Sequence, residues 1–175
     1  MRVYLDNCCY NRPFDEQDQL RVRLETEAKL AIQRQMRLGI LEYVWSDMLA
    51  NEVEESKFWE RKEKIAPWVL GACVYVVTTQ DIETRAEDFK ALGVKASDAI
   101  HLASAESADC DWFFTVDDGI LKKIDRVGKM RVSNPLEYIH LREFRLEFTV
   151  ADPIVFPTTN EAASVYSPSA ASGTA

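Results

Sequence analysis

The sequence predicts an α/β fold in which a central, mainly parallel sheet lies between two layers of helices. Short apolar runs alternate along the chain with longer segments of helical composition. The runs at residues 74–78 and 112–116 are apolar at nearly every position, which is typical of strands buried on both faces. A parallel sheet that is covered by helices on both sides, a three-layer α/β/α sandwich, accounts for both observations.

Five segments are predicted as strands because they are short, apolar and rich in β-branched or aromatic residues. They are residues 3–5, 40–45, 74–78, 112–116 and 130–132.

Five further segments have helical composition and recognisable ends. Gly39 stands where a C-cap glycine ends the first helix, and Ser46 and Ser97 are expected N-caps of the second and fourth helices. A further capped turn is expected at the "NPLEYI" stretch. The predicted helices are residues 16–38, 47–65, 81–92, 98–108 and 120–126.

The chain of 175 residues is expected to form one main domain, residues 1–141. Apolar and polar residues alternate from Phe144 to Val150, which is the pattern of a half-buried strand. We therefore expect residues 142–156 to add strand structure after the domain. Residues 157–175 are mostly Thr, Ser, Ala, Asn and Pro, and we expect them to form a disordered tail.

The composition limits the classes of function. The formal net charge of −8 argues against a large basic surface that coats nucleic acid, although it allows a small nucleic-acid site. No stretch approaches the roughly 18–20 apolar residues that span a bilayer, and the N-terminus lacks a secretory h-region. We therefore expect a cytoplasmic protein that does not enter the membrane.

The cysteines and histidines do not form a metal-binding motif. The four cysteines lack C-x-x-C spacing, so we expect reduced thiols that pack as small hydrophobic groups. The two histidines, His101 and His140, are too few and too far apart in the sequence to suggest a histidine-based metal site.

Two predicted strands end directly in an aspartate, Asp6 and Asp117. Because the carboxyl ends of parallel strands meet at one edge of the sheet, both side chains should reach that edge. Asp98 begins a predicted helix, whose N-terminus faces the same edge. Asp6 also fits a turn with Asn7, and Asp98 also fits a helix-capping role, so neither position identifies a site by itself.

Glu52 falls on the apolar face of the predicted helix 47–65. At about 100° per residue, it lies in the same sector as Leu49 and Val53, whereas Glu54 projects to the opposite side. A carboxylate on an apolar face is costly unless it is paired or binds a metal. Glu52 is therefore the candidate ligand from this helix.

Four carboxylates that converge would repel one another, and a divalent cation would remove that repulsion. Ligand sets made of oxygen atoms favour Mg²⁺ or Mn²⁺ over zinc. The sequence therefore predicts a metal site that is formed by Asp6, Glu52, Asp98 and Asp117.

The pieces "VYLDNC", "SDMLANEVEES", "KASDAIHLASA" and "FFTVDDGILKK" occur in the order and roughly the spacing of a known family. In these pieces, residues 1 to about 140 resemble the PIN domain nucleases, especially the VapC-like toxins of bacterial toxin–antitoxin pairs. The resemblance implies that Asp6, Glu52, Asp98 and Asp117 are the catalytic, metal-binding acids. It also places Thr115 as a supporting hydroxyl group, and Asp118 as a residue that could replace or assist Asp117.

The resemblance implies a PIN-like fold and a function. The family's activity is Mg²⁺- or Mn²⁺-dependent endoribonuclease cleavage of single-stranded RNA. Its toxin members are held inactive by a cognate antitoxin protein and commonly form homodimers.

The sequence leaves the contacts with the substrate open. Phosphate contacts from the basic stretch Lys122–Arg131 and a solvated helix face are equally consistent with the pattern. Tyr10, Asn11 and Arg12 are further candidates for stacking or phosphate contacts.

Two other functions compete with the nuclease. A haloacid-dehalogenase-like phosphatase needs a second Asp two residues after the first, and Cys8 occupies that position. A non-catalytic PIN-fold interaction module would typically have lost a carboxylate, and none of the four is missing.

Overall fold

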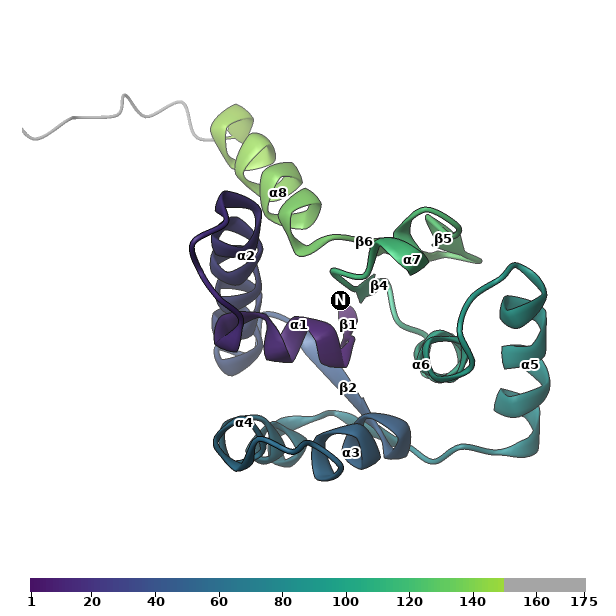
Figure 1. Ribbon diagram of the computed structural model, residues 1–175. Coiled ribbons are helices and arrows are strands. Elements are labelled where there is room, and N and C mark those ends of the chain that lie inside the picture. The colour runs from purple at the N-terminus through teal and green to yellow at the C-terminus, as the bar shows by residue number, and fades with distance from the viewer. Residues whose placement is uncertain (150–175) are drawn as a thin grey trace, which may run out of the picture.

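The computed structural model describes the backbone of residues 1–149 and the side chains of residues 1–142. It is an α/β sandwich around a six-stranded sheet (Figure 1). The strand order is β3-β2-β1-β4-β6-β5, and every neighbouring pair is parallel except β5 and β6. The strands are β1 (Arg2–Leu5), β2 (Glu42–Ser46), β3 (Val74–Val76), β4 (Trp112–Phe114), β5 (Arg126–Val127) and β6 (Met130–Ser133).

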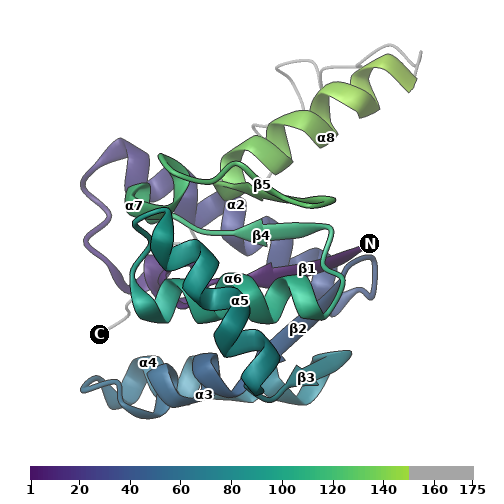
Figure 2. The ribbon, with the colours of Figure 1, turned by 90° about the vertical axis from the view of Figure 1, so that its right-hand side faces the viewer.

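Helices cover both faces of this sheet, as Figures 1 and 2 show from two directions at right angles. One face carries α2 and α8, and the opposite face carries α5 and α6. The α-helices are α1 (Asn7–Asn11), α2 (Leu20–Arg37), α3 (Asp47–Glu54), α4 (Trp59–Ile65), α5 (Gln80–Ala91), α6 (Ala96–Ser107), α7 (Asp118–Leu121) and α8 (Pro135–Thr149), and the 3-10 helices are η1 (Arg12–Phe14) and η2 (Ala66–Gly71). Among the described residues, no helix is both long enough and apolar enough to cross a membrane.

The central strands are buried on both faces, as their continuous apolar sequences predict. In β1, Val3 and Leu5 join one core cluster, whereas Tyr4 joins the other. In β4, Phe114 joins the cluster of Val3 and Leu5, whereas Phe113 joins the cluster of Tyr4. The sheet therefore separates two apolar cores, and the predicted three-layer α/β/α class is confirmed.

Three predicted boundaries in the helices are wrong. The segment 47–65 is not one helix, because the chain leaves helical structure after Glu54 and re-enters it at Trp59. Helix α6 begins at Ala96, so Lys95 rather than Ser97 is its N-cap. The segment 120–126 is mostly not helical, because α7 ends at Leu121 and a short antiparallel pairing of β5 with β6 follows.

The expected strand at Phe144–Val150 is also wrong for the described residues, because α8 continues to Thr149. The helix begins at Pro135, and the Asn134 side chain accepts a hydrogen bond from the Leu136 N–H. Arg142 donates a hydrogen bond to Gln35 of α2, which holds α8 against α2. Tertiary packing thus overrides a seven-residue alternation. The predictions for residues 150–156 and 157–175 lie outside the described residues.

Candidate metal centre

The carboxyl ends of β1, β2 and β4 lie side by side because these strands are parallel neighbours. Asp6 follows β1 directly, and its N–H donates a hydrogen bond to the Phe114 carbonyl of β4 at 2.9 Å. This bond continues the strand pairing by one residue. It fixes Asp6 at the edge of the sheet where ligands bind in parallel α/β folds.

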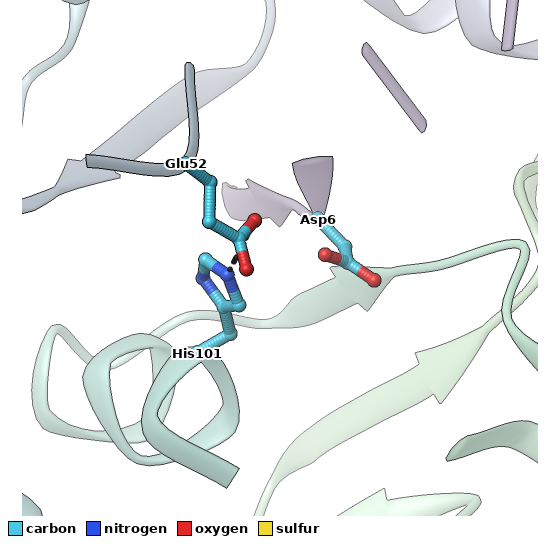
Figure 3. A group of neighbouring side chains, drawn as sticks. All are labelled: Asp6, Glu52 and His101. Atoms are coloured by element: carbon cyan, nitrogen blue, oxygen red, sulfur yellow. Dashed lines mark ion pairs between the residues drawn. The ribbon is translucent and has the colours of Figure 1, made fainter. Parts of the chain in front are cut away.

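Asp6, Glu52 and His101 converge on one point at this edge (Figure 3). They come from the end of β1, from α3 and from α6. One potential ligand atom from each residue lies within 4.8 Å of the others. Asp6 is buried at 5% exposure and the His101 side chain is fully buried, whereas the Glu52 side chain is 26% exposed. Solvent therefore reaches this group of side chains from the Glu52 side.

His101 is part of this site, and sequence reasoning missed it. We had set both histidines aside because they are distant from each other in the sequence. His101 follows Asp98 by three residues, so the two share a face of α6. That spacing was the available indication that His101 belongs with the acids.

A chain of buried polar groups holds His101 in place. Its Nδ1 lies 2.6 Å from the Tyr4 hydroxyl group, which lies 2.6 Å from the Ser46 hydroxyl group. Its Nε2 forms an ion pair with Glu52 at 3.2 Å. Because Tyr4 and Ser46 lie on β1 and β2, they hold His101 in position, and His101 in turn orients the Glu52 carboxylate.

Both ionisable partners of this pair are shifted toward their charged forms. Burial by itself would raise the pKa of Glu52, but His101 and the Asn7 side chain outweigh burial and lower it. Burial would likewise lower the pKa of His101, but Glu52 and Asp6 outweigh it and raise that pKa. The pair therefore keeps Glu52 ionised.

Two donors hold one oxygen of Asp6. Thr115 donates a hydrogen bond to Asp6 Oδ2 at 2.7 Å, as expected of a supporting hydroxyl group. The Cys8 thiol donates to the same oxygen at 2.9 Å. Burial raises the pKa of Cys8 well above its usual value, which keeps the thiol protonated and able to donate. Cys8 thus contacts a site residue, whereas we had assigned the cysteines to packing alone.

Asp98 and Asp117 lie around the same site. The pKa of Asp98 is raised by burial and then by the negative charges of Asp6 and Asp117. The Asp117 N–H donates to Thr115 Oγ1 at 3.1 Å, so one hydroxyl group links Asp117 to Asp6. Lys95, at 3.6 Å from Asp117, is mostly exposed and neutralises little of this negative charge.

Asp118 has a different environment from Asp117. Arg21 donates two hydrogen bonds to its carboxylate, at 2.6 and 3.1 Å. The same Arg21 contacts the fully buried Glu25 at 2.9 Å. Asp118 is therefore committed to a structural ion-pair network, and Asp117 is the better candidate for the site.

This set of side chains suits a divalent cation. Burial and then the charges of Asp6 and Asp117 raise the pKa of Asp98, and the buried His101, which is paired with Glu52, offsets only part of this negative charge. Carboxylate oxygens are ordinary ligands for Mg²⁺ or Mn²⁺, and both nitrogens of His101 already have protein partners. The metal-binding role of the four acids stays a prediction.

Comparison with known proteins supports the fold. No protein-family model and no curated protein matches the chain. The crystal structure of FitAcB from Neisseria gonorrhoeae matches 76% of this chain and 97% of that chain, with 16% identity and a TM-score of 0.51. The structure of FitAB bound to an IR36 DNA fragment matches 77% and 95%, with 19% identity and a TM-score of 0.47. At such low identity this likeness shows the fold alone, and the fold of the chain is PIN-like.

Proposed function

We propose that this protein is a Mg²⁺- or Mn²⁺-dependent endoribonuclease that hydrolyses phosphodiester bonds of single-stranded RNA. The observation that carries the proposal is the convergence of Asp6 and Glu52, with Asp98 and Asp117 around them, at the carboxyl edge of the sheet. Acids that lie close together, among which burial and the charges of Asp6 and Asp117 raise the pKa of Asp98, form an arrangement that a bound metal stabilises.

The residues of the site have two kinds of role, metal binding and positioning. Asp6 and Asp98 are the principal ligands of the cation, and Glu52 and Asp117 complete its shell. When bound, the cation polarises the phosphodiester and stabilises the charge that develops on the leaving oxygen. Thr115 and Cys8 fix Asp6 Oδ2, and His101 fixes Glu52.

One carboxylate of the four would accept the proton of the attacking water. In-line attack leaves a 5′-phosphate on the product. No covalent intermediate with the protein is needed.

The biological setting is part of the same proposal. The resemblance to VapC-like toxins supports a toxin that a cognate antitoxin protein inhibits, a homodimeric assembly and a cytoplasmic location. The four cysteines are free in the structure, which agrees with a reducing compartment.

The test is an RNA cleavage assay on a mixed pool with added Mg²⁺ or Mn²⁺. We expect Asp98→Asn to lower the rate by at least about 100-fold, because it removes a principal ligand of the cation. Asp118→Asn is the matched control and should retain activity. Cleavage that persists in Asp98→Asn, or without any divalent ion, would contradict the proposal.

A further inference from the structure

An exposed aromatic surface lies where the chain passes from α3 to α4. Phe58 and Trp59 are 61% and 68% exposed, and Phe14 of η1 is 37% exposed. A single exposed apolar residue is ordinary, but neighbouring exposed aromatic residues mark interaction sites. We call Phe14, Phe58 and Trp59 the aromatic surface.

Two hollows connect this surface to the candidate metal centre. The inner hollow, about 410 Å³, is lined at one end by Glu52, and the outer hollow, about 460 Å³, is lined by Trp59. Both are within the size range of small-ligand sites. The two hollows share the residues Lys57, Phe58 and Arg61. The two hollows are therefore neighbours, the inner one beside Glu52 and the outer one beside Phe14 and Trp59.

Cationic side chains outnumber acids in both hollows. Lys57, Arg61 and Lys62 line the inner hollow with Glu52 and Glu55, and Lys57 and Arg61 line the outer hollow with Glu60. Arg61 also pairs with Asp15 at 3.5 Å. Lys57 has no ion-pair or hydrogen-bond partner among the residues that the structure describes, so its ammonium group is available.

Arg61 stiffens the aromatic surface. Its guanidinium carbon lies 4.8 Å from the ring centre of Phe58, and it donates a hydrogen bond to the Phe14 carbonyl at 3.1 Å. These contacts tie the segment between α3 and α4 to η1. The Phe58 ring is therefore held in place before any ligand arrives.

We propose that the aromatic surface binds the single-stranded RNA next to the bond that is cut. Bases stack on Phe58 and Trp59, and Lys57 contacts a backbone phosphate. The inference rests on the proposed ribonuclease function and adds the path of the substrate. Alternating aromatic faces and cations beside a metal centre match a single strand of nucleic acid, whose phosphodiester must lie at that centre.

Asn11, which the sequence suggested, lines the inner hollow, whereas other suggested residues are buried or have partners. Tyr10 is buried at 1% exposure, so its ring cannot stack on a base. Lys123 donates a hydrogen bond to the Gly93 carbonyl, and Lys129 pairs with Asp109 at 3.4 Å. The surface between α3 and α4 is thus the better candidate for RNA contact.

The experiment measures binding of a short mixed-sequence RNA to the full chain by fluorescence anisotropy, with Ca²⁺ in place of Mg²⁺ and a gel to verify that the RNA stays intact. Phe58→Ala/Trp59→Ala should weaken binding about 5- to 150-fold for each base that loses its stacking. Phe58→Tyr/Trp59→Phe should retain affinity. Tyr75→Ala, which removes a half-exposed ring on β3, is the matched control and should also retain it.

Lys57→Ala gives an independent readout. Loss of one phosphate contact should reduce the slope of log affinity against log salt concentration by about 0.7 for a single strand.

The outcomes separate this inference from the proposed function. If the unmodified protein neither binds nor cleaves RNA, both fail. If it cleaves RNA but Phe58→Ala/Trp59→Ala binds unchanged, only the substrate path is overturned, and the aromatic surface is then assigned to a protein partner. Circular dichroism of each variant verifies that the fold is intact.

Discussion

Lys29 of α2 carries an amine that the fold buries without a carboxylate. The residue is 4% exposed, and its Nζ lies 5.7 Å from the ring centre of Tyr10. Burial lowers the pKa of Lys29 to about 8. In the unfolded chain the pKa of this amine returns to about 10.4. Burial of the protonated amine at neutral pH therefore lowers the stability of the folded state.

We expect Lys29→Met to raise the free energy of unfolding at pH 7 by roughly 1–3 kcal/mol. Between pH 8 and about 10.4 the unfolded protein binds more protons at Lys29 than the folded protein does, so the unmodified protein gains stability relative to the variant. The difference between the two should therefore shrink as pH rises above 8. Urea unfolding from pH 7 to about pH 9.5 measures it.

The control for this prediction is Lys64→Met. Lys64 is exposed on α4, so its substitution should change stability little and without dependence on pH. A Lys29→Met protein that is less stable than the unmodified protein at pH 7 would show that the amine has a stabilising partner.

Two helices on the site's side of the sheet begin with a side-chain cap. The Ser46 hydroxyl group accepts a hydrogen bond from the Leu49 N–H at the start of α3, and Thr79 accepts one from Ile82 at the start of α5. Ser46 has a second partner, because it also bonds Tyr4. One hydroxyl group thus positions both the helix that carries Glu52 and the chain of groups that leads to His101.

Thr79→Ala should lower the free energy of unfolding by about 1 kcal/mol, the usual effect of a lost N-cap. Ser46→Ala should lower it by roughly 2–3 kcal/mol, because it also leaves the buried Tyr4 hydroxyl group with one partner fewer. Chemical denaturation of both variants measures the difference. Equal losses would show that the bond between Ser46 and Tyr4 adds nothing to stability.

The position of the metal centre links several parts of the fold. Asp6 follows β1, and Glu52 and Asp98 lie on α3 and α6, so a cation that binds all of them connects elements on both sides of the sheet. Such a ligand stabilises the folded state by mass action.

Mn²⁺ at about 100 times its dissociation constant should stabilise the protein by about 2.7 kcal/mol, or roughly 5–10 °C in Tm. We expect this shift to disappear in Asp6→Asn and to remain in Asp118→Asn, whose carboxylate is bound by Arg21. Thermal unfolding monitored by fluorescence, with EDTA as the metal-free reference, gives both values. A shift of equal size in Asp6→Asn would exclude Asp6 as a ligand.

The sequence predicts the layers of this fold well and its irregular parts poorly. Continuous apolar runs identify the central strands, and Ser46 correctly begins α3. The break after Glu54 and the helix at 135–149 depend on contacts with other elements, such as Arg142 with Gln35, which no local pattern records.

For the site, the sequence by itself determined which acids stand at the ends of strands and on the apolar face of a helix: Asp6, Asp117 and Glu52. Only the tertiary structure decided that His101 and Cys8 contact these acids. It also decided that the Asp118 carboxylate is bound by Arg21. The physical reason is distance along the chain. The periodicity of strands and helices follows from neighbouring residues, whereas the partner of a buried polar group depends on packing between segments that are remote in sequence.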